Sequence, residues 1–331
     1  MRRPLVLPLL LLAACGAGEA PPRAAAPQPP YPPKAAEPAP SPERVEPEGR
    51  VVRVGPGPEG VAFDPRSGLV AVGTRDPAEL VLLDGATGEE RRRVALPSGP
   101  RHLQLARPGG PVLVPAEETD ELVEVSLPGG GTRVTRVGDN PHDAAALGDR
   151  VYVGDEFGST VTVVEDGRVV AQRPVDVQPG GVVAVGDQVG LISVRAYTIE
   201  LLDPRTLRGG GSQSAGLGPT HAVADDAGRV YVTDTRGDAL IVFETRPRLK
   251  WVARVPLPGS PYGIAVDRRR GAVWVTLVGR NEVTEVRVGA RPRRARTLPT
   301  VRQPNAIAVD ERSGRLFIAS RADGTLQLLD P

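Results

Sequence analysis

Histidine is the side chain through which this protein could most readily do acid–base or metal chemistry near neutral pH. The 331 residues include three histidines, His102, His142 and His221, and each lies one or two positions after a proline. Imidazole exchanges a proton near pH 6.5 and is a frequent ligand of transition metals. The shared spacing predicts that the three side chains gather at one place in the fold.

The proline before each histidine belongs to a short pattern that recurs seven times: proline, one or two variable residues, then an apolar run. The seven prolines are Pro58, Pro100, Pro141, Pro179, Pro219, Pro261 and Pro304. Their spacing is about 40 residues, the length of one four-stranded propeller blade. Pro and Gly are also abundant, 36 and 39 residues, which favours many short strands joined by turns over long helices.

Each repeat contains the same series of strands, and the two ends of the series complement each other. The last repeat reaches a third strand near residues 326–329 and then ends, while residues 50–54 form a strand pattern that precedes the first repeat. Pairing these two segments would complete the seventh sheet and remove exposed strand edges. The sequence therefore predicts an all-β fold over residues 50–331, a seven-bladed β-propeller closed by an N-terminal strand that completes the last blade.

Tyr231-Val232-Thr233-Asp234 nearly spells the motif that names the YVTN-type β-propeller repeat family, and residues 151–155 and 273–276 are looser copies. From residue 50 to residue 331 the chain resembles this family. The resemblance implies a seven-bladed propeller of the kind common in exported bacterial proteins. It implies no particular activity, because such propellers carry many functions.

In propellers, the links between blades and the hairpins between second and third strands lie on one face, at the mouth of the central channel. We expect the residues directly after each proline to surround that mouth. The candidate ligand-binding residues are Glu59, Arg101, His102, His142, Asp143, Thr220, His221, Tyr262 and Asn305.

Two kinds of function fit such a mouth. The first is a noncatalytic scaffold that binds a protein, a peptide or a cell-envelope ligand and needs no cofactor. The second is a metal-assisted enzyme of the lactonase or lyase type, in which His102, His142 and His221 hold a divalent metal ion. In the second case the acidic hairpin residues Glu117, Asp155 or Asp234 would assist.

Composition and missing motifs exclude several other classes. The formal net charge is +1, from 41 basic and 40 acidic side chains, which gives no overall attraction to nucleic acid. The sequence has no Gly-x-Ser-x-Gly elbow, Walker loop or His-Glu-x-x-His motif. Trp251 and Trp274 lie in strand patterns and are expected in the core, and Gly209 to Ser212 replace a fourth strand, which predicts an irregular outer edge.

The first 49 residues predict export and anchoring. Residues 1–15 combine two arginines, a short apolar run and Leu12-Ala13-Ala14-Cys15, which resembles the bacterial lipobox. Cys15, the single cysteine of the chain, is then the expected site for acyl chains such as palmitate; the alternative is an ordinary secretory signal. Residues 16–49 are rich in Pro and Ala and predict a disordered tether. We expect a monomeric, extracytoplasmic lipoprotein of the cell envelope that touches the membrane only through its lipid.

Overall fold

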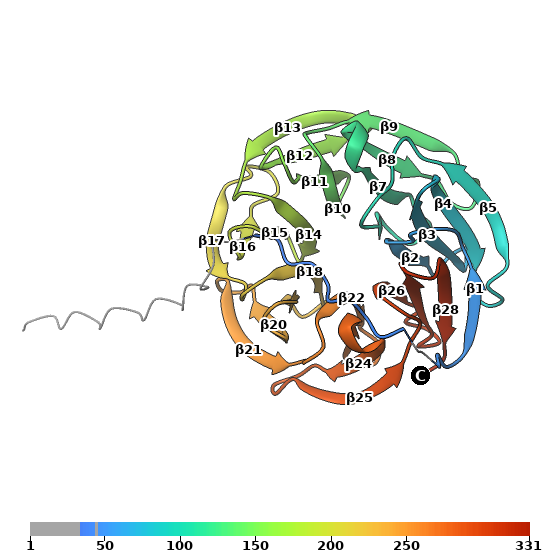
Figure 1. Ribbon diagram of the computed structural model, residues 1–331. Coiled ribbons are helices and arrows are strands. Elements are labelled where there is room, and N and C mark those ends of the chain that lie inside the picture. The colour runs from blue at the N-terminus through green and yellow to red at the C-terminus, as the bar shows by residue number, and fades with distance from the viewer. Residues whose placement is uncertain (1–33, 44–45) are drawn as a thin grey trace, which may run out of the picture.

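The computed structural model describes residues 34–43 and 46–331. These residues form seven antiparallel four-stranded sheets that stand around a central channel (Figure 1). The predicted all-β, seven-bladed propeller is confirmed. The predicted signal, Cys15 and the first part of the predicted tether lie outside the described residues, and no helix among the described ones is long and apolar enough to cross a bilayer.

The blades follow one another along the chain, and we number them by the repeat proline that opens each. Blade 1 contains β2 (Val61–Asp64), β3 (Leu69–Arg75), β4 (Ala78–Asp84) and β5 (Glu90–Ala95). Blade 2 contains β6 (Gln104–Leu105), β7 (Val112–Ala116), β8 (Glu121–Val125) and β9 (Thr132–Arg136). Blade 3 contains β10 (Pro141–Leu147), β11 (Arg150–Asp155), β12 (Thr160–Glu165) and β13 (Arg168–Pro174). Blade 4 contains β14 (Pro179–Val185), β15 (Gln188–Ser193), β16 (Thr198–Leu202) and β17 (Gly209–Ser214).

The remaining blades have the same plan. Blade 5 contains β18 (Pro219–Ala224), β19 (Arg229–Asp234), β20 (Ala239–Glu244) and β21 (Lys250–Pro256). Blade 6 contains β22 (Pro261–Asp267), β23 (Ala272–Leu277), β24 (Glu282–Arg287) and β25 (Arg293–Pro299). Blade 7 contains β26 (Pro304–Val309), β27 (Leu316–Ser320), β28 (Thr325–Leu329) and β1 (Arg50–Arg53). Two 3-10 turns, η1 (Glu117–Thr119) and η2 (Val278–Arg280), follow β7 and β23.

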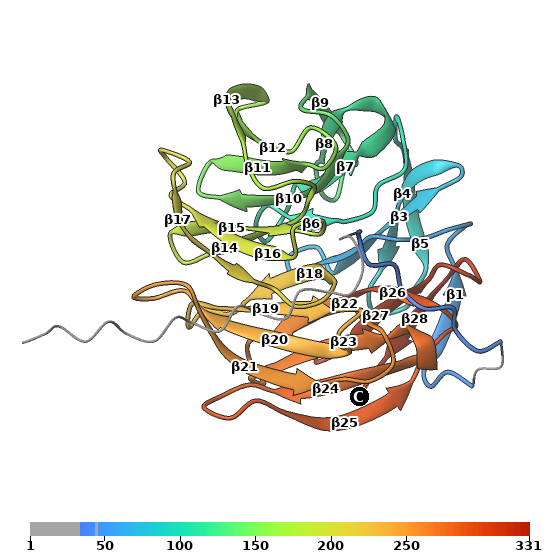
Figure 2. The same ribbon diagram turned by 60° about the vertical axis from the view of Figure 1, so that its left-hand side comes forward.

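The ring closes where β1 pairs with β28. Val52 lies opposite Leu326 and Arg50 opposite Leu328, so the N-terminal strand is the fourth strand of blade 7. Figures 1 and 2 both show the blue strand β1 beside the red strand β28. This is the predicted closure, and it covers the edge of β28 with a fourth strand.

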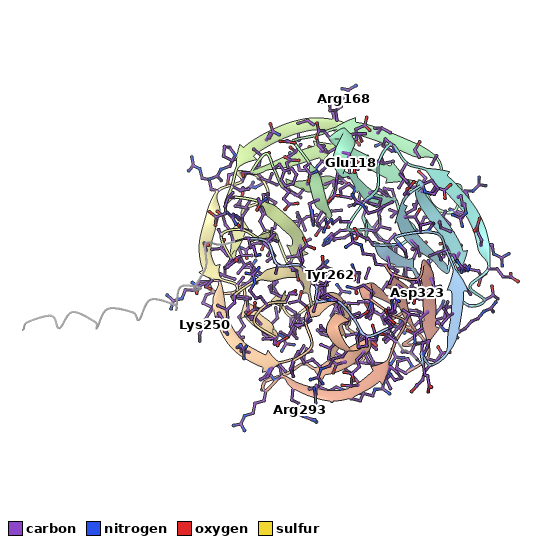
Figure 3. The ribbon with its side chains drawn as sticks, in the orientation of Figure 1. Glu118, Arg168, Lys250, Tyr262, Arg293 and Asp323 are labelled. Atoms are coloured by element: carbon purple, nitrogen blue, oxygen red, sulfur yellow. The ribbon has the colours of Figure 1, made fainter. Side chains whose placement is uncertain are left out.

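The hydrophobic core consists of seven clusters, each shared by two neighbouring blades. Blades 7 and 1, for example, share Val54, Val72, Phe317 and Leu326. The middle strands are therefore buried on both faces, which explains their nearly continuous apolar sequences. The fourth strands face solvent: in β25, which contains Arg293, most side chains are exposed, and Figure 3 shows Arg293 on the outer rim of the ring.

Two expectations for single residues can be checked here. Trp274 is buried, at 1% exposure, but Trp251 is 37% exposed on the outer strand β21, so its expected place in the core was wrong. The fourth strand of blade 4 does form, from Gly209, although its pairing with β16 shifts register between Glu200 and Leu202. The same kind of shift occurs between the third and fourth strands of blades 1, 3, 5 and 6. The register shift therefore gives blade 4 no special irregularity, and the expected replacement of its fourth strand was wrong.

The predicted tether differs from expectation over residues 34–43. These residues lie against the propeller and form hydrogen bonds with it from Lys34 to Pro42. Composition predicted a free segment because it offers little apolar surface to bury. The propeller instead binds the backbone of the segment, which composition does not reveal.

Candidate functional site

The three histidines meet at the channel, as their common position in the repeat predicts. The rings of His102 and His221 stack with centroids 4.3 Å apart, and the ring of His142 is 4.8 Å from that of His102. The edge of the Tyr262 ring meets His221 at 4.4 Å, and Tyr262 is seen near the central opening in Figure 3. Blades 2, 3, 5 and 6 thus place four rings side by side.

Asp143 holds the strands around this cluster in place. Its carboxylate accepts hydrogen bonds from the backbone N–H of Val182, at 2.9 Å, and from the side chain of Gln104, at 3.0 Å. It therefore joins blades 2, 3 and 4, and its Oδ2 lies 3.8 Å from Nδ1 of His102. Burial raises the pKa of Asp143 to about 6, although the N–H donors of Val182 and Gln104 favour its charged form.

Charged side chains of both signs, His142 among them, form a continuous series of ion pairs that we call the charged arc. Its members are Arg321, Glu59, Arg75, Arg101, Glu117, His142 and Glu156, from blades 7, 1, 2 and 3. Arg321 and Glu59 are 2.7 Å apart, and Arg75 and Glu117 are 2.8 Å apart. Arg101 lies between Glu59 and Glu117, at 3.8 and 3.6 Å. The two glutamates, 5% and 7% exposed, are thereby buried with cationic partners.

His142 lies near one end of the charged arc, between the carboxylates of Glu117 and Glu156. Its Nδ1 is 2.8 Å from Glu156 and 3.1 Å from Glu117, although neither approach has the direction of a hydrogen bond. Burial opposes the charge on this ring, but the two carboxylates outweigh burial and raise the pKa of His142 to about 9. His142 is therefore cationic at neutral pH.

His102 and His221 have the opposite protonation state. Burial, together with the positive charge of His142 and Arg101, lowers the pKa of His221 to about 3. Burial and the neighbouring histidines also hold the pKa of His102 well below its usual value. Both rings are neutral at pH 7, and Nδ1 of His221 has no hydrogen-bond partner among the described residues.

The remaining predicted residues divide into two groups. Glu59, Arg101, Tyr262 and Asn305 lie at the mouth, and the buried Oδ1 of Asn305 also lacks a partner in the described chain. In contrast, the hydroxyl group of Thr220 already forms hydrogen bonds with the hydroxyl groups of Thr233 and Thr235.

Of the acidic hairpin residues, only Glu117 joins the charged arc. Asp155 accepts hydrogen bonds from Gly138, Thr160 and Thr162, and Asp234 accepts them from Leu217, Gly218 and Gly237. Both are buried ends of second strands. Their predicted assistance at the site was wrong, because hairpin backbone and hydroxyl groups already saturate them.

Sequence reasoning missed Arg75, Glu156 and Arg321, which complete the charged arc. All three lie at the end of a second strand: Arg75 is the last residue of β3, and Glu156 and Arg321 directly follow β11 and β27. Glu117 follows β7 of blade 2 in the same way. Blades 4, 5 and 6 have Val194, Thr235 and Val278 there. Aligning the seven hairpins at this position would have predicted a mouth with a charged half and an uncharged half.

Among the residues that the structure describes, Glu117, His142 and Glu156 are the one set of three potential metal ligands whose atoms all lie within 4.8 Å of one another. Ligands about 2.1 Å from a six-coordinate ion are about 3.0 Å apart, close to the two separations at His142. His102 and His221 are outside this set. The geometry therefore groups one of the three predicted histidine ligands with two glutamates.

A cavity of about 790 Å³ extends from this layer through the ring. At the mouth, the cavity is lined by Glu59, Arg101, His102, His221 and Asn305. Its wall is formed by small and aliphatic side chains of the innermost strands, such as Val61 and Ile264, and it reaches the opposite face at the exposed Arg269 and Arg312. The polar groups of the mouth thus lie at one end of the channel, and these arginines lie at the other.

The architecture and the mouth define the chain as a seven-bladed β-propeller with a polar, partly charged channel entrance. No protein-family model matches the sequence, and no curated protein matches it. The resemblance to YVTN-type repeats therefore stays a prediction from the sequence.

Solved structures show the same fold. Hydrazine synthase of Kuenenia stuttgartiensis is similar with a TM-score of 0.73 and 16% identity over 86% of this chain and 98% of that one. Virginiamycin B lyase from Staphylococcus aureus has a TM-score of 0.70 and 13% identity over 86% and 100% of the two chains. The Myceliophteria thermophila Cps50 (Swd1) propeller domain has a TM-score of 0.72 and 15% identity over 85% and 99%. At such identities the similarity concerns the fold alone.

Proposed function

We propose that this chain is a membrane-anchored, extracytoplasmic lipoprotein whose propeller binds a polar ligand, a protein, peptide or cell-envelope component, at the channel mouth that carries the charged arc. One observation carries the binding proposal: Glu59 Oε2, Asn305 Oδ1 and His221 Nδ1 are buried at the mouth without hydrogen-bond partners in the described chain. A buried polar atom without a partner costs about 1–3 kcal/mol. A ligand with complementary donors and acceptors would supply the missing bonds.

The anchoring part of the proposal rests on the sequence Leu12-Ala13-Ala14-Cys15. Cells expressing the full chain should incorporate an alkyne-labelled palmitate into it and retain it in the membrane fraction. The Cys15→Ser variant should lose the label and leave the membrane, because no acyl chain then contributes its ~0.8 kcal/mol per buried CH₂. Membrane retention of an unlabelled Cys15→Ser chain would contradict a lipid anchor.

Binding can be tested by thermal unfolding in the presence of soluble muropeptides and short charged peptides. A ligand at 100 times its dissociation constant should stabilise the fold by about 2.7 kcal/mol. Glu59→Gln keeps the shape of the mouth but removes a charge that faces Arg321, Arg75 and Arg101. This variant should bind at least about tenfold more weakly, a loss of about 1.4 kcal/mol.

The matched control is Glu89→Gln, the same change at an exposed turn of blade 1. It should respond to the ligands as the wild-type protein does. Equal stabilisation of all three proteins would place the binding elsewhere, and no stabilisation of the wild-type protein by any of these ligands would count against the binding function.

A second function, a metal-assisted enzyme, is favoured by the Glu117–His142–Glu156 group. These three side chains would hold a divalent ion, which would supply Lewis-acid chemistry. His142 would have to release its proton first, and the neutral ring of His102 lies 4.8 Å from it and stacks on His221. One similar solved structure is a lyase, virginiamycin B lyase, which gives this alternative a precedent in fold only.

Metal binding separates the two functions. Isothermal titration of the chelator-treated protein with Zn²⁺ and Mg²⁺ should show one site per chain if the enzyme proposal is right, and Glu156→Gln should abolish it. Glu118→Gln, at an exposed neighbour of Glu117, is the control. A wild-type protein that takes up neither ion would leave the binding scaffold as the supported function.

A further inference from the structure

The segment before the propeller crosses the face that carries the mouth. In Figure 1 the first described residues, in blue, run past β18 and β22 towards β26. We call residues 34–43 the strap. The strap contacts blades 4 to 7, and three of these, blades 4 to 6, form the uncharged half of the mouth.

The beginning of the strap is held by a tyrosine and an arginine. The hydroxyl group of Tyr197 accepts the backbone N–H of Lys34 at 2.9 Å and donates to its carbonyl at 2.7 Å. The guanidinium of Arg236 donates to the carbonyls of Lys34 and Ala35, at 3.1 and 3.2 Å, and stacks on the ring of Tyr197. Both propeller side chains thus recognise backbone and not side chains.

The middle of the strap alternates proline with residues that keep a backbone N–H. Pro38, Pro40 and Pro42 flank Ala39 and Ser41. The N–H of Ala39 donates to Ser260 Oγ at 3.0 Å, and the N–H of Ser41 donates to Gln303 Oε1 at 3.2 Å. The prolines favour an extended backbone before binding, so little conformational entropy is lost when the segment docks.

Further bonds secure the end of the strap: Gln303 donates to the Ala39 carbonyl, and Asn281 donates to the Pro42 carbonyl. Every donor and acceptor that the propeller offers along the strap comes from a loop between strands, not from a sheet edge. These loops therefore form a groove whose polar side chains are positioned to bind an extended backbone.

Two glycines of the propeller make room for the small side chains of the strap. Ala36 is 6% exposed, and a Cβ on Gly218 would lie 2.8 Å from the Ala36 methyl group. A Cβ on Gly279 would lie 3.5 Å from that of Ala39. Alanine fits at these two positions, and a longer side chain at position 36 would have no space.

One acidic side chain connects the strap with the charged arc. Glu37 Oε2 lies 3.9 Å from the guanidinium of Arg101. Glu37 is 63% exposed and Arg101 29%, so the pair is weak. It nevertheless directs a carboxylate of the strap towards the charged arc.

We propose that the loops of blades 4 to 7 form a binding groove for an extended, proline-containing acidic peptide, and that residues 34–43 are its resident occupant. The strap covers the uncharged half of the mouth, and a peptide of the same chemistry binds only in competition with it. Docking of the strap does not depend on the proposed function. Binding of a second peptide rests on the proposed function and specifies its ligand class.

Hydrogen exchange of the full-length chain in detergent tests the docking. The amides of Lys34, Ala39 and Ser41 should exchange at least about tenfold more slowly than in a synthetic peptide of residues 34–43. Ala36→Arg cannot fit against Gly218 and should remove this protection. Pro40→Arg adds the same charge at an exposed position of the strap and should keep it. An unchanged unfolding midpoint in both variants will show that the propeller itself is intact.

Fluorescence anisotropy with the labelled synthetic peptide tests the second part. The Ala36→Arg protein should bind the peptide at least about tenfold more tightly than the wild-type protein, whose own strap competes at an effective concentration of about 1 mM. A peptide with lysine in place of Glu37 should bind about two- to fivefold more weakly, through loss of the Arg101 contact.

Three results would overturn the proposal. Wild-type strap amides that exchange as fast as the free peptide would show that the strap does not dock. Loss of protection in Pro40→Arg would show that the fit at Ala36 is not what holds it. An Ala36→Arg protein that binds no peptide would show that the groove has no affinity of its own, whereas the muropeptide titration reports separately on the charged arc.

Discussion

At the scale of single residues, the mouth keeps one histidine charged and two neutral within a few ångströms. His142 is cationic because Glu117 and Glu156 flank it, while His221 is neutral because burial and the neighbouring positive charges disfavour its protonated form. Ordinary histidines titrate together near pH 6.5. Here a pH change across neutrality would leave the protonation states of the three histidines unaltered. The mouth therefore suits ligand binding that is independent of pH better than pH sensing.

The low pKa of His221 predicts an acid-sensitive fold. Its pKa is about 3 in the folded protein and about 6.5 in the unfolded chain. Between these values the unfolded chain binds the proton and the folded chain does not, so stability is complete above pH 6.5 and falls as the pH decreases towards 3. One such group contributes up to about 1.4 kcal/mol per pH unit.

The variant His221→Gln should therefore lose less stability than the wild-type protein between pH 6 and pH 4. Urea unfolding at a series of pH values, in the presence of a chelator, measures the difference. Between pH 7 and pH 8 the two curves should run parallel, because His221 is then neutral in both states. Parallel curves down to pH 4 would mean that His221 is protonated in the folded protein.

At the scale of elements, the innermost strands approach one another closely because the repeat places glycine near their start. A Cβ on Gly263 in β22 would lie 2.7 Å from the carbonyl oxygen of Asn305 and 3.2 Å from Cα of Ala306, both in blade 7. Blades 1 and 4 also have glycine at this position, Gly60 and Gly181. The packing between neighbouring blades therefore depends on the absence of a side chain.

Gly263→Ala should destabilise the propeller by about 1–3 kcal/mol, since the added methyl group overpacks the contact between blades 6 and 7. Gly129→Ala is the matched control, because that glycine is exposed and a Cβ there would meet nothing within 4 Å. Urea denaturation followed by tryptophan fluorescence compares the two variants. Equal midpoints would show that blade 7 can move away without cost.

The strand pattern and the histidine position were predictable because each depends on a repeat of about 40 residues with a regular apolar spacing. The charged arc was only half predictable. Glu59, Arg101 and His142 follow the repeat prolines, but Glu156 and Arg75 lie in the hairpins, where only an alignment of all seven repeats would have shown their common position. The strap was not predictable, since its small and proline residues indicate the lack of a core and reveal nothing about the loops of blades 4 to 7 that bind its backbone.

At the scale of the whole molecule, the ring is held closed by four residues of β1 at the start of the fold and β28 at its end. This pairing joins segments more than 270 residues apart, while other contacts within a sheet are local. Because every blade packs against two neighbours, separation of β1 from β28 would expose the shared cluster of blades 7 and 1 around Phe317. Opening at this seam should therefore be the step that limits global stability.

A disulfide across the seam tests this expectation, and Arg53 and Thr325 are paired opposite each other there. The chain has one natural cysteine, Cys15, which would be replaced by serine. Oxidised Arg53→Cys/Thr325→Cys should be about 2–4 kcal/mol more stable than its reduced form, because the bond closes a very long loop. The pair Glu165→Cys/Arg168→Cys, opposite each other in a tight hairpin of blade 3, should gain much less. Urea midpoints with and without reductant measure both, and an equal gain at the two positions would show that the seam is no weaker than any other pair of strands.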